Sequence, residues 1–425
     1  MPANVLQSDL ESQTNSLATQ VFPNAAKPFA NAANTLLNGL VKSGSTLVTD
    51  IAAYLDDTRA HHGGTRETMP KGLCERVSRW LEDYDFATPA AQWLLARNAP
   101  RVDRDTTLAA DLSDLSKPFG GKGMEGMARG RDASRKSIAW GHTFGAVVAV
   151  APSRQHVFPL CFAFGKGRKG ENERIEEPVR AVSKATDGKG TFALDRGSDS
   201  ERALTFLQTL PNRAVVRVKE LQRDVFGNGQ KIDAQLDAEP RVDARLHKSS
   251  GPVEAKISWR AGRLGELHDT PLLLVRSEFD GRALYLYVIP GAEDIQHNLL
   301  EKNPRRLATA AAQAYLDRWQ IETFFERVKQ DFSLEDARVR TFKRLSNLFH
   351  LCVLGYSFIT DFLPSSAVHR RMLKVFKDNS HRLAFRMQTF LSGLRALLER
   401  PRLNFIAGRP RRRVFVPDAQ MALAL

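Results

Sequence analysis

The sequence predicts a mixed α/β sheet with an antiparallel β insertion, flanked by helical N- and C-terminal regions. Helical patterns fill most of residues 1–104, a strand-rich stretch follows, and Ala-rich helical sequence returns near residue 307. Of the 425 residues, 42% are hydrophobic and 26% are charged, which is ordinary for a globular chain of two or three domains. These three observations set the fold class, and each segment is justified in order below.

The net charge and the cysteines limit the function. The formal net charge of +14 favours a polyanionic partner, nucleic acid first, although charge alone leaves a basic enzyme of another kind open. The three cysteines are far apart and form no CxxC motif, so neither a zinc site nor a disulfide framework is indicated. We see no signal peptide and no membrane-spanning run, so we expect a cytoplasmic protein without a membrane partner.

The first region is predicted to be helical. Candidate helices are Asn31–Leu55, with a break near Gly44, then Leu73–Tyr84 and Pro89–Arg97. The pair Thr88-Pro89 is a favourable helix start. The second and third helices could form a helix-turn-helix, but two short helices joined by a turn are a common and weak pattern.

From about Asp105 the chain alternates buried strands with short helices. Apolar runs bounded by turn residues predict these elements. In order they are the strands Thr107–Leu115, Gly141–Val150 and His156–Gly165, the helix Pro178–Ala185, the strand Gly190–Asp195, the helix Ser200–Leu210 and the strand Arg213–Lys219. This order predicts a mixed sheet of the ribonuclease-H-like kind.

Acidic residues stand at the ends of two of these strands. The first strand ends in Asp111 and Asp114, and the strand Gly190–Asp195 ends in Asp195. Open α/β sheets bind their ligands at the carboxyl ends of strands. We therefore expect carboxylates from both strands to lie at one site.

The stretch after Asp195 is too long for a single strand and helix. Short β runs at Val253–Trp259, Pro271–Arg276 and Ala283–Ile289 follow within it. They predict an antiparallel β insertion over about residues 220–305.

An uninterrupted helix is predicted from Leu307 to Lys329, because this stretch starts Ala-rich and contains neither Pro nor Gly. On a straight helix, Tyr315, Arg318, Glu322 and Lys329 would fall within an arc of about 60°. A carboxylate in this polar stripe can hold a divalent metal while the cations and the phenol bind phosphates. A solvated ion pair between Arg318 and Glu322 is the alternative interpretation.

The spacing Tyr-x2-Arg-x3-Glu-x6-Lys resembles the signature of IS4-type DDE transposases, and Tyr315, Arg318, Glu322 and Lys329 match it at every position. The sequences Asp111-Leu-Ser-Asp-Leu and Leu194-Asp-Arg-Gly-x-Asp199 resemble the contexts of that family's two aspartates. The resemblance covers about residues 105–345. It implies that Asp111, Asp195 and Glu322 are the catalytic carboxylates, with Asp114 as the alternative for the first.

The resemblance also implies a chemistry. The three carboxylates would hold two Mg²⁺ ions, for which Mn²⁺ can substitute, and Asp111 would bridge them. The protein would cleave transposon-end double-stranded DNA and transfer the 3′-OH strand into target DNA, as a homodimer in the synaptic complex on the bacterial nucleoid. Two alternatives stay open: a domesticated DDE-type nuclease that cuts without integrating, and a catalytically inactive DNA-binding protein.

The regions and DNA-contacting residues follow from the same resemblance. Residues 1–104 are expected to bind DNA ends, 105–345 to form the catalytic domain, and 346–425 to be helical and basic. Arg196, Tyr315, Arg318 and Lys329 are expected to contact DNA.

Relatives stack a flipped base on a tryptophan in the last strand of the insertion. Tyr285 is the nearest aromatic here and is the candidate, although packing within the sheet also explains it.

Overall fold

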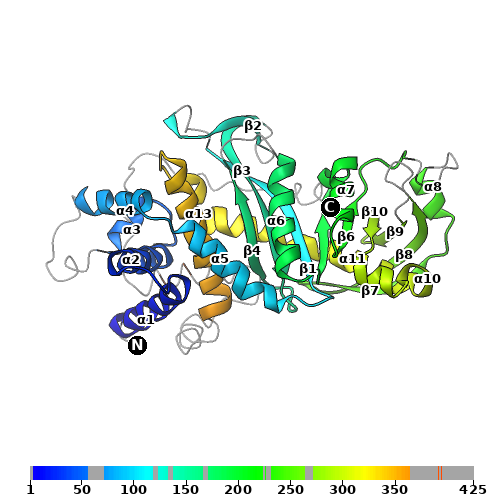
Figure 1. Ribbon diagram of the computed structural model, residues 1–425, viewed down its shortest axis with the longest axis horizontal. Coiled ribbons are helices and arrows are strands. Elements are labelled where there is room, and N and C mark those ends of the chain that lie inside the picture. The colour runs from blue at the N-terminus through cyan, green and yellow to red at the C-terminus, as the bar shows by residue number, and fades with distance from the viewer. Residues whose placement is uncertain are drawn as a thin grey trace.

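The computed structural model describes residues 3–55, 71–117, 123–132, 137–165, 171–223, 225, 231–263, 271–363, 391 and 394. These residues form one open ten-stranded sheet with helices at both ends of the molecule (Figure 1). The predicted mixed α/β fold of the ribonuclease-H-like kind is confirmed.

The centre of the sheet is parallel. The three strands there are β1 (Thr107–Ser116), β5 (Thr191–Leu194) and β6 (Arg213–Arg217), in that spatial order. Three more strands extend the sheet beside β1, all antiparallel to their neighbours: β3 (Ser137–Val150) on β1, with β2 (Ala128–Asp132) and β4 (Val157–Phe164) on β3. The predicted pairing of two buried strands is therefore the β3–β4 hairpin.

The β insertion continues the same sheet. Four antiparallel strands follow outward from β6: β10 (Arg282–Ile289), β9 (Pro271–Phe279), β8 (Gly251–Arg263) and β7 (Val242–Lys248). The predicted antiparallel insertion is confirmed, but sequence analysis does not find β7. Only Leu246 is buried in that edge strand, so its apolar alternation is too weak to see.

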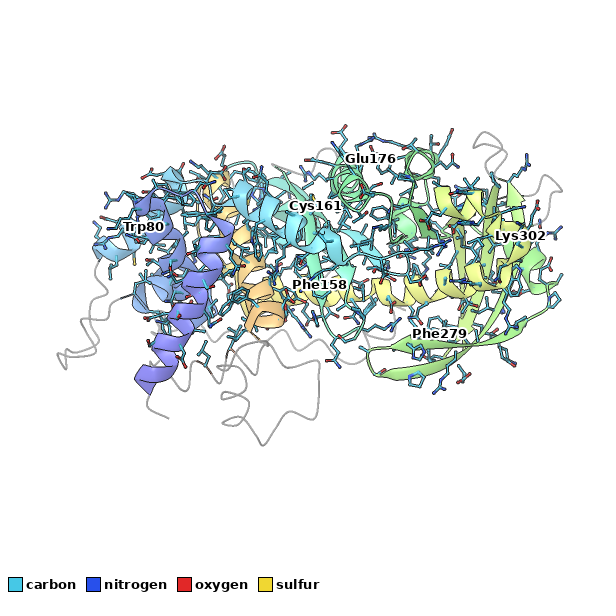
Figure 2. All side chains as sticks on the ribbon, turned by 60° about the horizontal axis from the view of Figure 1, so that its bottom comes forward. Trp80, Phe158, Cys161, Glu176, Phe279 and Lys302 are labelled. Carbon is cyan, nitrogen blue, oxygen red and sulfur yellow. The ribbon has the colours of Figure 1, made fainter. Side chains whose placement is uncertain are left out.

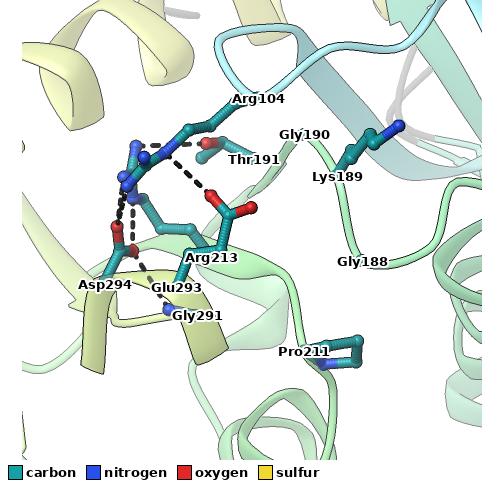
Figure 3. A pocket seen from close by; sticks show the side chains of 10 residues that line it. All are labelled: Arg104, Gly188, Lys189, Gly190, Thr191, Pro211, Arg213, Gly291, Glu293 and Asp294. Carbon is teal, nitrogen blue, oxygen red and sulfur yellow. Dashed lines mark hydrogen bonds and ion pairs between the residues drawn. The ribbon is translucent and has the colours of Figure 1, made fainter. Parts of the chain in front are cut away.

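Short helices connect the insertion to its surroundings. They are α8 (Ile232–Asp237), which precedes β7, and α9 (Ala292–Gln296) and α10 (Leu299–Lys302), which follow β10. Asp294 in α9 ties the returning chain to the sheet (Figure 3): it accepts two hydrogen bonds from Arg213, at 2.8 and 2.6 Å, and one from the Gly291 amide at 3.1 Å. Arg104 adds a third cationic contact at 3.4 Å.

Helices cover both faces of the sheet. One face packs against α6 (Glu171–Ala185) and α7 (Glu201–Gln208). The other face packs against α11 (Pro304–Arg318), α12 (Gln320–Glu326) and α13 (Phe342–Ser357). In Figures 1 and 2, α11 runs lengthwise under the sheet from the insertion toward the centre of the molecule.

The predicted helix over Leu307–Lys329 is wrong as a single element. Trp319 interrupts it after α11, and a π-helix, Arg327–Asp331, follows α12. The two parts contact different portions of the sheet: α11 lies along the insertion strands and also contacts β1 and β5, whereas α12 contacts β1 and β4. A π-turn adds a residue per turn, so the predicted 60° arc does not extend to Lys329.

Helix α6 begins seven residues before the predicted start at Pro178. Proline usually marks a helix start because it has no amide hydrogen for the carbonyl four residues earlier. Here that carbonyl belongs to Arg174 and lies against Gly145 of β3, where a Cβ would come within 1.9 Å of the oxygen. The glycine leaves room for the carbonyl, and the helix continues through the proline.

The N-terminal region is helical, as predicted. Its helices are α1 (Ala3–Val21), α2 (Lys27–Ser43), α3 (Val48–Ala53), α4 (Lys71–Asp83) and α5 (Ala87–Asn98), the last followed by a 3₁₀ turn, Ala99–Arg101. Gly44 ends α2 with a φ of 53°, so the predicted break there is confirmed. Sequence analysis does not find α1.

Beyond residue 346, α13 continues into a π-helix, Phe358–Phe362. Most of the C-terminal region that is predicted to be helical and basic, including the basic sequence from Arg409 to Arg413, lies outside the described residues. Among the helices that the structure describes, none combines the length and apolarity needed to cross a membrane.

Candidate active site

Three carboxylates from distant parts of the chain share the face of the sheet that α11 and α12 cover. Asp111 lies in β1 just beyond the residues that pair with β5, and Asp195 directly follows β5. Glu322 lies in α12, which packs against β1. The three are close enough to interact electrostatically: Asp195 raises the pKa of both Asp111 and Glu322, and Asp111 also raises the pKa of Glu322.

Arg318 connects two of the three carboxylates. Its Nη1 donates to Asp111 Oδ2 at 3.0 Å and its Nη2 donates to Glu322 Oε1 at 2.8 Å. The Arg318 side chain is only 5% exposed. Its pair with Glu322 is therefore a buried bridge and not the solvated surface pair that the spacing also allowed.

Tyr315 connects the third carboxylate. Its hydroxyl donates to Asp195 Oδ1 at 3.1 Å, and its ring lies 5.4 Å from the Arg318 guanidinium carbon. Arg217, the last residue of β6, hydrogen-bonds Tyr315. Sequence analysis does not single out Arg217. A charged residue that closes a buried parallel strand, at the same edge as Asp195, is the signal that could have found it.

Burial sets the protonation of two of the acids. It raises the pKa of Asp111 to about 6 and that of Glu322 to about 7, and the shared Arg318 opposes both shifts. A backbone amide, that of Leu112, donates to Asp111 Oδ1 at 2.8 Å and also favours the charged form. One guanidinium shared by two carboxylates does not overcome their loss of hydration.

Asp114, the alternative first aspartate, faces the other way. It stands three residues after Asp111 on the same strand, so its side chain emerges on the opposite face. There it accepts a hydrogen bond from Thr143 Oγ1 at 3.2 Å. The structure brings Asp111 to Arg318 and Glu322, and it places Asp114 on the α6 side.

The predicted DNA-contacting residues are placed differently from one another. Tyr315 and Arg318 lie among the carboxylates, and exposed Arg196 follows Asp195 in a 3₁₀ turn, Arg196–Ser198. Lys329 is half-buried in the π-helix. Tyr285 packs on the α6 and α7 side of the sheet, the face opposite Tyr315, so the structure does not bring it to the carboxylates. Their contacts with DNA stay predictions.

The donor chemistry of the site fits a hard divalent cation. Carboxylate oxygens are the ligands that Mg²⁺ prefers, and three of them converge here. Within the part of the chain that the structure describes, no group of three His, Cys, Asp or Glu side chains is arranged to hold a metal ion as it stands. The Arg318 guanidinium lies between two of the three carboxylates.

Comparison with known protein families matches residues 105–358, more than half of the chain, to the transposase DDE domain. The chain belongs to this family. No curated protein matches the chain. Membership makes this a transposase-type nuclease that acts on DNA, from a family whose domains generally use divalent metal ions. The three carboxylates lie inside the transposase domain, on β1, at the end of β5 and on α12.

Proposed function

We propose that this transposase domain belongs to the IS4 type and that Asp111, Asp195 and Glu322 are its catalytic carboxylates. The protein would cleave transposon-end DNA and join the resulting 3′-OH to target DNA, as a homodimer that brings two ends together. The observation that supports this most is the convergence of three acids, far apart in the sequence, around Arg318 and Tyr315.

The chain's own residues would bind the cofactor and position the substrate. Asp111, Asp195 and Glu322 would hold two Mg²⁺ ions, for which Mn²⁺ can substitute, and these ions would stabilise charge on the phosphate and activate the attacking hydroxyl. Exposed Arg196 beside Asp195 is suited to a phosphate contact. Lys329 and Tyr285 would contact DNA further from the carboxylates.

The acids can be tested one at a time. Asp111→Asn, Asp195→Asn and Glu322→Gln should each abolish Mg²⁺-dependent cleavage of transposon-end DNA. End binding, measured by gel shift, should stay nearly intact, because ligation of the metal needs the negative charge and most phosphate contacts do not. Full cleavage by any one of these variants would remove that residue from the site.

Asp114→Asn is the matched control, since it makes the same change on the same strand but on the opposite face. It should cleave normally. An inactive Asp114→Asn beside an active Asp111→Asn would reverse the choice of first aspartate. A strand-transfer assay completes the test: cleavage without any joined product would support a nuclease and contradict the transposition half of the proposal.

A further inference from the structure

A single side chain, that of Arg318, hydrogen-bonds two of the three carboxylates. It is 5% exposed, and its two terminal nitrogens each serve a different carboxylate, Asp111 and Glu322. Its Nε is also buried and has no hydrogen-bond partner among the described residues. The guanidinium is thus held at this place by the two acids alone, together with the face of the Tyr315 ring.

The position of Arg318 conflicts with metal ligation. Asp111 Oδ2 and Glu322 Oε1, two of the oxygens available to a divalent cation, already accept the guanidinium hydrogens at 3.0 and 2.8 Å. Arginine cannot lose its proton in a protein, so its charge stays and repels a second cation. A metal that uses these two oxygens must displace the guanidinium.

We infer that Arg318 is a resident counter-ion that closes the carboxylate site without metal and exchanges with the entering cation, after which its guanidinium is available to a DNA phosphate. Arg318 is the last residue of α11, directly before the interruption at Trp319, so its side chain stands at the one point where the two helix segments separate. The inference makes Arg318 a positioning residue, and it rests on the proposed metal-binding function.

The exchange predicts a gain of metal affinity on losing the arginine. In calorimetric titrations of the full chain with MnCl₂, Arg318→Gln should bind Mn²⁺ at least about tenfold more tightly than the wild type, because no resident charge must be displaced. Without Mn²⁺ the variant should melt at a lower temperature than the wild type, since two buried carboxylates lose their shared cation. Saturating Mn²⁺ should remove most of that difference.

Arg213→Gln is the matched control. Arg213 is also a buried arginine, 10% exposed and paired with a buried carboxylate, Asp294, but it lies at the opposite end of β6 from Arg217 (Figure 3). This variant should also melt at a lower temperature, yet its affinity for Mn²⁺ should equal that of the wild type, and Mn²⁺ should not restore its stability. Equal restoration in both variants would mean that Mn²⁺ acts on stability in general, and would overturn the inference.

Two further results distinguish a failure of the counter-ion inference from a failure of the proposed metal site. If Arg318→Gln does not fold, the same titration is made with Arg318→Lys. A lysine ammonium lacks the planar guanidinium that hydrogen-bonds both carboxylates at once, so this variant should bind Mn²⁺ more tightly than the wild type. Unchanged or weaker affinity in the folded Arg318 variants overturns the counter-ion. Absence of Mn²⁺ binding in the wild type and in the folded Arg318 variants alike would instead contradict the proposed metal site itself.

Discussion

At the scale of single residues, the pKa of a buried acid depends on its hydrogen-bond donors as well as on its burial. Asp294 is 3% exposed, yet its pKa lies below the ordinary value of 3.8: burial pushes it up, and hydrogen bonds from Arg213, the Gly291 amide and Arg104 outweigh that effect. Asp111 and Glu322 share one arginine, and burial raises both of their pKa values. The donors around Asp294 keep it ionised and so stabilise the fold. The single arginine shared by Asp111 and Glu322 leaves these two carboxylates available to a more highly charged cation.

The Asp294 pair has a testable pH dependence. A carboxyl whose pKa is lowered by folding stabilises the folded state above its ordinary pKa of 3.8, and that contribution is lost as the pH falls through its folded-state value. Asp294→Asn should therefore reduce the free energy of unfolding by about 3 kcal/mol at neutral pH. The deficit relative to the wild type should shrink as urea denaturation is repeated toward and below the ordinary pKa.

An exposed pair provides the comparison. Glu176 pairs with Arg202, whose side chain is 54% exposed. Glu176→Gln should change the urea midpoint little at any pH, because water screens this pair. A pH-independent deficit in Asp294→Asn would show that the lost hydrogen bonds, and not the charge, account for its effect.

At the scale of elements, α6 continues through Pro178 because β3 has a glycine opposite it. The Arg174 carbonyl has no amide partner at Pro178 and lies against Gly145. The side chain of the same residue also contacts β3: Arg174 Nη1 donates to the Thr143 carbonyl at 3.0 Å. Helix and strand are therefore joined at one close approach of their backbones, on the face opposite the carboxylates.

Gly145→Ala should be one of the most destabilising single methyl additions in the chain. Its Cβ would lie 1.9 Å from a backbone oxygen, so α6 must shift, and we expect a loss of at least about 2 kcal/mol in the free energy of unfolding. Gly72→Ala, at an open position in α4, is the control and should be neutral or slightly stabilising. Equal urea midpoints for the two variants would contradict the close approach.

At the scale of the whole molecule, the N-terminal helices and the transposase domain share one hydrophobic core. The largest cluster includes Leu36 of α2, Phe86 before α5, Phe144 of β3 and Phe349 of α13, together with Leu391 and Leu394. Asn347 of α13 fixes the α4–α5 turn: its side chain accepts from the Phe86 and Ala87 amides and donates to the Leu81 and Tyr84 carbonyls. The N-terminal helices, Leu391 and Leu394 are thus part of one folding unit with the transposase domain.

A fragment comprising residues 105–358 alone should consequently fail to fold. It would expose the apolar surface that α2 and α5 cover, and it would leave Asn347 without its four partners. The full chain should unfold in one calorimetric transition, and the fragment should show none. A cooperative transition in the isolated fragment would show that the transposase domain folds independently of its flanks.

Local sequence patterns suffice for much of this protein because strands, turns and helix spacing are local. Alternating apolar residues predict the central strands, and Asp195 follows the end of its strand in sequence as in space. The spacing of Tyr315, Arg318 and Glu322 places them within two turns of helical chain, whatever surrounds it. Sequence patterns do not find edge strand β7, and they predict too late a start for helix α6. In both cases the neighbouring strand, and not the local sequence, stabilises the element.

Only the tertiary structure decides what these residues contact. The interruption at Trp319 lies between α11, which runs from the insertion strands to β1, and α12, which packs on β1 and β4. The faces of Asp114 and Tyr285, which separate them from the carboxylates, depend on the register of β1 and β10 within the sheet. The sequence alone determines that Arg318 stands four residues before Glu322. That the same guanidinium also binds Asp111, 207 positions earlier in the chain, depends on packing that buries Arg318 and leaves both carboxylates half-buried.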